Sequence, residues 1–432
     1  MKKYITLASL LALFSTSLFA QDATPQLDSG STAWMIVATA FVLMMTIPGL
    51  ALFYGGLVRR KNVLSVFMQC FILVSVLSLE WVIIGYSLAF GSSEGFLKPF
   101  VGGFGYAFLN GIGINNIEAT GIPTILFVLF QGMFAVITPA LIIGAFAERI
   151  KFSGFLLFSV LWALFIYNPL AHWVWSADGW LFKMGALDFA GGTVVHINAG
   201  IAALVMAILL GKRRDYKGHA LPPHNIPFVA MGAALLWIGW FGFNAGSGLA
   251  ANGLAANAFL VTHIATATAA FVWAVLEWII GKKPTVVGIS TGAVAGLVAI
   301  TPASGSVNLV GAIAIGVTVA LICFFMVAFV KVKLGYDDSL DAFGVHGVGG
   351  IIGAILTGVF ATSAVTGGAE GGWHQFGVQF ISVVATIAYS GIGTIILFFI
   401  VDKTLGLRAP DNDEAVGLDE TQYGETAYTS FD

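Results

Sequence analysis

The chain has 432 residues, of which 58% are hydrophobic and only 9% are charged, and its mean hydropathy is +0.93. This composition excludes a soluble protein of two or three domains and predicts a polytopic membrane protein. The formal net charge of −3 is too small to favour a nucleic-acid partner, and no pattern in the chain predicts an enzyme, a cofactor or a metal site.

The N-terminal residues predict a secretory signal peptide at 1–20. The segment MKKYITLASLLALFSTSLFA begins with Lys2 and Lys3, continues with a short apolar core and ends in small residues before Gln21. This arrangement is typical of a cleaved signal rather than of a membrane span. We therefore expect the mature chain to begin outside the membrane.

Eleven further apolar segments predict transmembrane helices, and hence an all-α fold. A helix needs about 20 residues to cross roughly 30 Å of hydrocarbon. An odd number of crossings places the C-terminus in the cytoplasm, where 403–432 would form a tail. The segments lie near 32–57, 63–90, 121–147, 154–175, 192–211, 228–246, 258–280, 285–303, 309–331, 342–363 and 375–402.

The distribution of basic residues agrees with this orientation. Cytoplasmic loops of membrane proteins are enriched in Lys and Arg, and only Lys98 and Lys183 lie in predicted outer loops. We therefore expect a multi-pass protein with its N-terminus outside. The basic residues near the predicted inner ends of the spans are Arg59, Arg60, Lys61, Arg149, Lys151, Lys212, Arg213, Arg214, Lys217, Lys282, Lys283, Lys331, Lys333, Lys403 and Arg408.

Two motifs divide the spans into related halves. DFAGGTVVH places Asp188 eight residues before His196 in the fifth span, and DSLDAFGVH places Asp338 eight residues before His346 in the tenth. Five crossings per half is an odd number, so the second half would run through the membrane upside down, the inverted repeat of many transporters. The predicted units are repeat one at about 32–211, repeat two at about 228–363 and an extra helix at about 375–402, all within a membrane domain at 21–402.

The two histidines are predicted to meet near the middle of the membrane. Each lies about 12 Å from its Asp at 1.5 Å per residue, and the two approach from opposite sides. Flanking glycines, including Gly200 and Gly347, remove side-chain bulk and let the helices approach. An ionisable intramembrane residue is a functional candidate by default; the alternative is a pair that only bonds two helices together. A neutral pair suits a small polar neutral molecule better than a bare cation.

Aromatic residues predict a second site above the histidines. Phe130 and Phe134 lie one helical turn apart on the third span. Trp175 ends the fourth span, while Phe243 and Ser247 lie near the end of the sixth. Aromatic faces with a hydroxyl group can hold a small cation through cation–π attraction and one hydrogen bond. An interfacial aromatic belt is the alternative interpretation.

With these features in place, the chain resembles the ammonium transporters of the Amt/Mep/Rh type, and most closely their bacterial Amt branch. The resemblance covers nearly the whole predicted mature chain, and the matching stretches follow one another in order. They are PGLALFYGGLVRRKNVLS (48–65), GYSLAFG (85–91), FQGMFA (130–135), GAFAERIKFS (144–153), GALDFAGGTVVHINAG (185–200), PHNIPFV (223–229), IGWFGFNAGS (238–247), GLVAITPASG (296–305), FGVHGVGG (343–350) and GLRAP (406–410).

The resemblance implies roles for the outer residues. Trp175, Phe130 and Ser247 match the residues that recruit ammonium at the outer face. Phe134 and Phe243 match the stacked phenyl gate beneath that site.

The resemblance also implies roles for the residues deeper in the path. His196 and His346 match the twin-histidine pore centre, and Trp240 lines the same path. Asp188 matches a supporting carboxylate that orders the outer vestibule without touching substrate. Ammonium would lose its proton at the outer site or at the histidines, and ammonia would cross the apolar lumen. Potassium cannot deprotonate, so it would meet the full desolvation cost.

As partners, the resemblance implies ammonium or its analogue methylammonium, a homotrimer with one pore per subunit, and a PII-type nitrogen signalling protein at the cytoplasmic face. The location it implies is the lipid bilayer of a bacterial inner membrane. Three alternatives stay open: an ammonium sensor with little net transport, an Rh-like gas channel of broader selectivity, and a membrane cytochrome whose paired histidines ligate haem.

Two features depart from these patterns. Glu80 lies within the second span, where the family usually has an apolar residue, and we expect it either to contact a neighbouring subunit or to modify conduction. The acidic segment 411–432 is typical of a disordered tail, but GLRAP just before it favours a tail that is partly ordered and regulatory.

Overall fold

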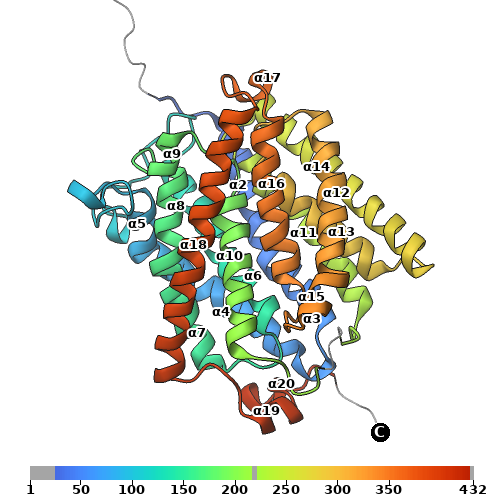
Figure 1. Cartoon of the computed structure of the whole chain (residues 1–432). Helices are drawn as coiled ribbons and strands as arrows, with labels where there is room; N and C mark the ends of the chain where they lie inside the picture. The colour runs from blue at the N-terminus through green and yellow to red at the C-terminus, as the bar shows by residue number, and fades with distance from the viewer. Residues whose placement is uncertain (1–24, 217–220, 429–432) are drawn as a thin grey trace, which may run out of the picture.

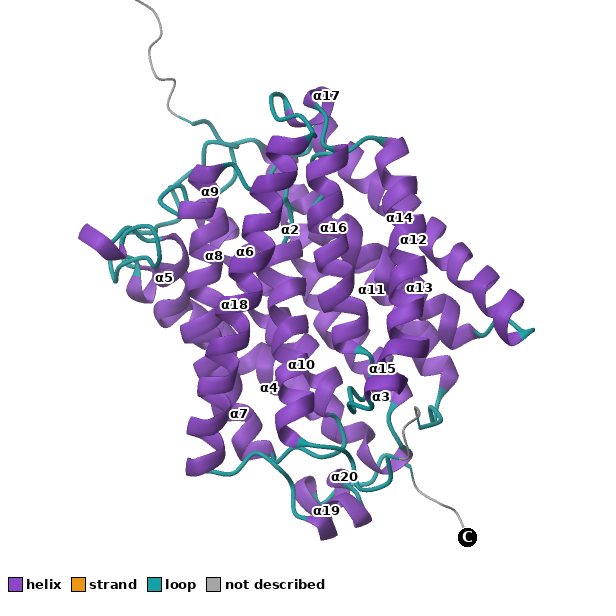
Figure 2. Cartoon of the chain, viewed as in Figure 1, coloured by secondary structure: helices purple, strands orange, loops and turns teal. Residues whose placement is uncertain are grey.

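Helices make up nearly all of the regular secondary structure, and they pack side by side in one bundle (Figures 1 and 2). The computed structural model describes residues 25–216 and 221–428, and within them it contains no strand longer than an isolated bridge. The predicted signal peptide at 1–20 lies outside the described residues. The all-helical fold is therefore confirmed.

The α-helices begin and end as follows: α2 (Ser29–Met44), α3 (Ala51–Leu57), α4 (Val63–Glu80), α5 (Tyr86–Phe90), α6 (Thr124–Phe146), α7 (Phe152–Trp162), α8 (Asn168–Trp175), α9 (Trp180–Met184), α10 (Asn198–Leu210), α11 (Ile226–Gly246), α12 (Gly253–Gly281), α13 (Val286–Ile300), α14 (Leu309–Phe325), α15 (Lys331–Leu334), α16 (Val348–Phe360), α17 (Ser363–Thr366), α18 (Trp373–Thr404), α19 (Asp411–Val416) and α20 (Leu418–Tyr423).

Ten helical segments in the described ranges are long and apolar enough to cross a membrane, once helices that continue through a bend are joined. All eleven segments predicted from hydropathy are helical. The segment predicted at 285–303 is too short to count among the ten. Its helix α13 has only 15 residues and is followed by turns from Thr301. These turns are buried in protein, where their backbone groups can find partners without facing lipid.

Polar side chains begin several of these helices. The first backbone N–H groups of a helix have no partner within it, and a side-chain oxygen at the N-cap accepts from them. Asp28 caps α2 in this way, Asn252 caps α12, Thr285 caps α13 and Asn308 caps α14. These caps fix where four spans start, and so how far each reaches into the bundle.

Short π-helical turns interrupt several spans, and two of them carry the histidines. The turn η7 (Gly192–Ile197) contains His196 and leads into α10, and the turn η9 (Phe343–Gly347) contains His346 and leads into α16. Such turns often mark functional sites because they widen the helix and redirect side chains. The two turns contact each other at the crossing of the two helices.

Glycines set how close this crossing is. A Cβ added to Gly200 would collide with the backbone of Gly347 on the facing helix. A Cβ added to Gly350 would come within 3.0 Å of the Cβ of His196. The glycines flanking the histidines therefore allow the close helix approach predicted from the sequence, since any side chain there would push the two helices apart.

The two ends of the bundle differ. In Figure 1, α9 and α17 lie at one end, while α19 and α20 lie at the other, beneath the spans. The C-terminal segment is thus partly folded: within the described residues it forms two short helices that pack on the membrane domain.

Candidate functional site

Two imidazoles lie side by side at the centre of the bundle. Nδ1 of His346 is 3.4 Å from Nδ1 of His196, and the ring centroids are 5.4 Å apart with an angle of 20° between the planes. Both side chains are almost fully buried. The contact predicted from the paired motifs is therefore present in the structure.

A small, largely enclosed cavity of about 10 Å³ adjoins the pair. That is room for about one water-sized molecule. Of the residues that line it, only the two histidines are ionisable; the others include Leu50, Ile137 and Val294. Nε2 of His196 is buried and has no hydrogen-bond partner within 25–216 and 221–428, so the site offers a polar atom to whatever occupies it.

Two phenyl rings are stacked beside this cavity, and one of them, that of Phe243, lines it. The rings of Phe134 and Phe243 have centroids 4.2 Å apart, and the ring of Phe243 also stacks on His196 at 6.0 Å. Phe130 contacts Phe134 edge to face at 5.0 Å. Phe130 and Phe243 are wholly buried and Phe134 is nearly so, and the three rings form one contiguous cluster next to His196.

The outermost predicted residues stand next to these rings. Trp175 meets Phe134 edge to face, with centroids 5.7 Å apart and an interplanar angle of 88°, and it is partly exposed. The Ser247 hydroxyl donates to the carbonyl of Phe243 at 2.8 Å and is also partly exposed. The structure thus gathers all five outer and gate residues from α6, α8 and the end of α11.

Asp188 organises the turn that carries His196. Its Oδ1 accepts from the N–H groups of Gly191 and Gly192 at 3.0 and 2.5 Å, and its Oδ2 accepts from Thr193 and Val194 at 2.9 and 3.1 Å. Burial raises the pKa of Asp188, and the four N–H donors act against that rise. Its carboxylate accepts only from backbone N–H groups, and Asp188 does not line the cavity beside the histidines.

Asp338 repeats the arrangement on the other half of the chain. Its two oxygens accept from the N–H groups of Ala342 and Phe343 at 3.0 and 2.8 Å. These residues begin η9, the turn that carries His346. The eight-residue spacing in both motifs therefore reflects the same local structure.

Trp240 lines the cavity as expected, and its partner is a residue that the sequence did not indicate. The indole N–H of Trp240 donates to the hydroxyl of Thr301 at 2.8 Å, and its ring stacks on His196 at 5.4 Å. Thr301 lies in the turn directly after α13. The early end of that helix is what positions the hydroxyl.

A buried charge network lies below the site, at the end of the bundle that carries the tail. Arg213 donates to Glu148 at 2.8 Å and to Asp337 at 2.8 Å, and Arg59 also donates to Glu148 at 3.0 Å. Burial alone would raise the pKa of Glu148, but Arg213 and Arg59 outweigh it and hold that pKa below its usual range. The same balance between burial and Arg213 lowers the pKa of Asp337.

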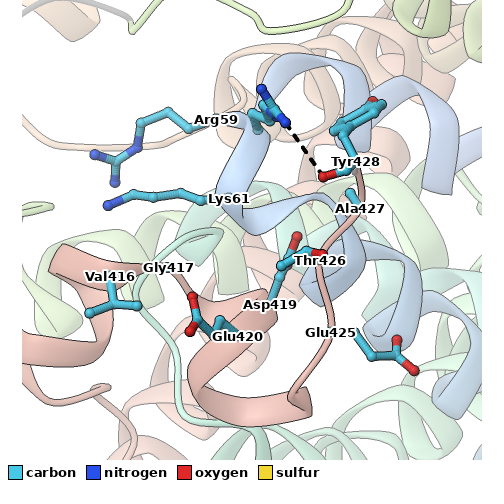
Figure 3. A pocket seen from close by; sticks show the side chains of 11 residues that line it. Arg59, Lys61, Val416, Gly417, Asp419, Glu420, Glu425, Thr426, Ala427 and Tyr428 are labelled. Carbon is cyan, nitrogen blue, oxygen red and sulfur yellow. Dashed lines mark hydrogen bonds between the residues drawn. The ribbon is translucent and has the colours of Figure 1, made fainter. Parts of the chain in front are cut away.

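The tail closes a pocket of about 480 Å³ against the same end. Figure 3 shows Arg59 and Lys61 lining it together with tail residues such as Glu420 and Tyr428. Asp419 accepts from the N–H groups at the start of α4, including that of Ser65 at 2.7 Å. The fold thus fastens the tail to the loop between the first two spans.

Glu80 is the intramembrane carboxylate whose role the sequence left open. It lies inside the chain, with 8% of its surface exposed, and its Oε1 accepts from Nδ2 of Asn168 at 2.7 Å. The expectation that Glu80 contacts a neighbouring subunit is therefore wrong, because its carboxyl group faces α8 of the same chain.

Comparison with known proteins identifies the family. The model of the Ammonium Transporter Family matches residues 33–428. The chain belongs to this family. It is 51% identical over 424 residues to an ammonium transporter of Aquifex aeolicus (strain VF5), with 97% of each chain covered. The resemblance drawn from the sequence motifs is thereby confirmed.

Solved structures of the Ammonium Transporter Family share the fold. The crystal structure of Saccharomyces cerevisiae Mep2 matches with a TM-score of 0.83 and 37% identity over 90% of this chain and 89% of that one. A structure described as a sensor Amt protein matches with a TM-score of 0.84 and 30% identity over 91% of this chain and 98% of that one. This chain is accordingly a multi-span membrane protein.

Proposed function

We propose that this chain transports ammonium by passing ammonia through the twin-histidine cavity. The observation that carries the proposal is the largely enclosed apolar cavity for one small molecule, with two contacting imidazoles in its wall and stacked phenyl rings beside it. Such a site holds a neutral hydrogen-bonding molecule, whereas a bare cation there would lose its hydration without a compensating charge.

Recruitment of ammonium is assigned to the outer aromatic residues. The ring faces of Trp175 and Phe130 offer cation–π attraction. The hydroxyl proton of Ser247 is engaged by the carbonyl of Phe243, so its oxygen lone pairs are left to accept an N–H from the cation. This combination favours ammonium, which carries N–H donors, over potassium, which carries none.

The phenyl gate favours loss of a proton before ammonium moves inward. Phe134 and Phe243 are in contact, and ammonium would have to leave its water behind to pass between them. Ammonia carries no charge, so its desolvation costs far less free energy. Asp188 supports this step by holding the vestibule side of η7 in place.

The histidine pair would then guide ammonia by hydrogen bonding. At 3.4 Å, the Nδ1 atom of one ring carries a hydrogen and donates a hydrogen bond to the Nδ1 atom of the other ring. Because each neutral ring has one N–H, the Nε2 of one ring then carries a hydrogen while that of the other presents a lone pair. A donor and an acceptor are thus available to one ammonia molecule.

For the membrane arrangement we propose eleven crossings, with α13 and the turns after it as the short one. The two Asp-capped π-turns, η7 and η9, support an inverted repeat with the boundaries predicted above. The N-terminus would lie outside and the C-terminus in the cytoplasm of a bacterial inner membrane. The folded tail would be the surface at which a PII-type protein docks, and the assembly would be a homotrimer.

The match to a protein described as a sensor Amt favours one second candidate, an ammonium sensor with little net transport. Uptake separates the two. Proteoliposomes that contain this protein should accumulate methylammonium above empty vesicles, and Trp175→Leu should reduce that uptake. Binding of methylammonium without accumulation would favour the sensor.

Electrical recording tests the fate of the proton. If the proton follows ammonia by a separate histidine and water relay, pulses of ammonium on supported proteoliposomes should produce currents. Flux without charge movement would contradict the relay while leaving ammonia conduction intact.

A further inference from the structure

A buried acid and a buried amide meet between two spans, away from the pore cavity. Glu80 ends α4 and Asn168 begins α8, and Oε1 of the acid accepts from Nδ2 of the amide at 2.7 Å. Neither residue lines the cavity beside the histidines. Within 25–216 and 221–428, no Lys, Arg or His forms an ion pair with Glu80.

The local backbone turns the acid inward. The π-helical turn η3 (Trp81–Gly85) follows Glu80 directly and brings Gly85 alongside it, five residues on. A Cβ added to Gly85 would lie 2.7 Å from Oε2 of Glu80. The missing side chain at Gly85 therefore makes the space in which the carboxyl group lies.

Among the described residues, two oxygen atoms of this pair find no hydrogen-bond partner. Oε2 of Glu80 and Oδ1 of Asn168 are both buried without a hydrogen bond. They belong to the two groups that the 2.7 Å hydrogen bond already joins. The amide oxygen is always an acceptor, and both oxygens of an ionised carboxylate are acceptors too, so the two cannot bond to each other while Glu80 is ionised. An ionised Glu80 would thus leave two buried acceptors unsatisfied and a full charge away from water, both of which are costly.

One proton removes both costs. A protonated carboxyl group has one O–H donor, and Oδ1 of Asn168 is an acceptor on the group it already contacts. The acid and the amide then exchange two hydrogen bonds, N–H to Oε1 and O–H to Oδ1, and no charge remains. We propose that Glu80 is a proton-binding site in the membrane domain, held as a neutral acid in a face-to-face pair with the amide of Asn168. This inference does not depend on the transport function.

In the part of the chain that the structure describes, no other ionisable group forms an ion pair with the Glu80 carboxyl group. The phenol of Tyr167, from the turn before α8, is the titratable neighbour and is itself buried without a hydrogen-bond partner. His172 lies one turn further along α8, and its ring nitrogens contact the carbonyls of Ala89 and Lys98 at 2.9 and 2.8 Å. Both ring nitrogens thus contact backbone carbonyls rather than the Glu80 carboxyl group.

The site also lies beside the helix that carries the phenyl gate. The indole of Trp81, the next residue, donates to the carbonyl of Val128 at 2.9 Å and packs on Gly132. Gly132 lies between Phe130 and Phe134 on α6. The proposed acid–amide pair is therefore next in sequence to a side chain that packs on the segment between Phe130 and Phe134.

Infrared spectroscopy on reconstituted protein tests the proposal directly. At about pH 7, where an ordinary Glu is ionised, the native protein should show a carbonyl stretch of a protonated carboxylic acid that is absent from Glu80→Gln. The band should shift on exchange into heavy water. Glu277→Gln is the matched control, because Glu277 is partly exposed and accepts from Thr285, and it should leave that band unchanged. A Glu80→Gln spectrum that lost only carboxylate bands would overturn the proposal.

Thermal unfolding gives an independent readout. Glutamine offers the same donor and acceptor pattern as protonated glutamic acid, so Glu80→Gln should keep the pair. The advantage of its apparent melting midpoint over that of the native protein should grow from about pH 5 to about pH 8, because the native fold retains a proton that the unfolded chain, with a Glu pKa of about 4.3, releases. A native protein more stable than Glu80→Gln at the higher pH would show that Glu80 is ionised and refute the proposal.

Discussion

Replacing Asp188 with asparagine should destabilise the turn that carries His196. The carboxylate accepts four backbone N–H bonds, two on each oxygen. An asparagine keeps one oxygen and turns an NH2 group toward two of those donors, so two hydrogen bonds to a charged acceptor are lost. At about 1.5–3 kcal/mol each, the expected cost is about 3–6 kcal/mol.

Two measurements on the Asp188→Asn variant would detect this change. Its apparent thermal midpoint in detergent should fall, and methylammonium uptake should drop because His196 is no longer held opposite His346. Asp178→Asn is a matched control. Asp178 is a carboxylate of a neighbouring loop whose salt bridges to Lys98 and Lys183 are largely exposed, and such pairs contribute about 0–1 kcal/mol.

The outcome that would refute this reasoning is a variant as stable as the Asp178→Asn control with native uptake. The turn would then be held by its packing, and the four hydrogen bonds would be incidental. A stable variant with lost uptake would instead assign Asp188 a direct part in recruiting or deprotonating the substrate.

Three further predictions follow from other contacts. Gly200→Ala should lower stability by about 1–3 kcal/mol and reduce uptake, because the added methyl group meets the backbone of Gly347; native stability and uptake would contradict this role. Thr301→Val should cost about 1–3 kcal/mol by leaving the buried indole N–H of Trp240 unpaired, and a melting midpoint equal to the native one would argue against it. Because the pKa of Glu148 is lowered in the fold, its contribution to stability is present above the unfolded pKa of about 4.3 and is lost as the pH falls through the folded pKa. Acid titration of melting midpoints should therefore show a steeper loss for the native protein than for Glu148→Gln, and parallel curves would contradict it.

The spans and the histidine pair were predictable because each leaves a local pattern in the sequence. A membrane helix needs a continuous apolar run, and the repeated spacing from Asp to His marks the same capped turn twice. The aromatic residues were harder, since membrane interfaces also favour them. Resemblance to the Ammonium Transporter Family, rather than spacing, separated Trp175 and Phe134 from ordinary aromatic residues.

Contacts between residues far apart in the chain could not be predicted, because they leave no local pattern in the sequence. Arg213 meets Glu148 and Asp337 across 65 and 124 residues, and nothing in the neighbourhood of any of the three predicts the other two. The partner of Glu80 was hidden for the same reason, because Asn168 lies 88 residues away. The early end of α13, which positions Thr301, depends on tertiary packing that overrides an apolar run.

The measurement that tests the account most directly is paired uptake of methylammonium and potassium by proteoliposomes carrying the double variant His196→Ala, His346→Ala. If the histidines guide a neutral molecule through the cavity, the variant should lose either native-like methylammonium uptake or the exclusion of potassium. Native uptake together with full exclusion of potassium would show that the pair has no part in conduction or selectivity.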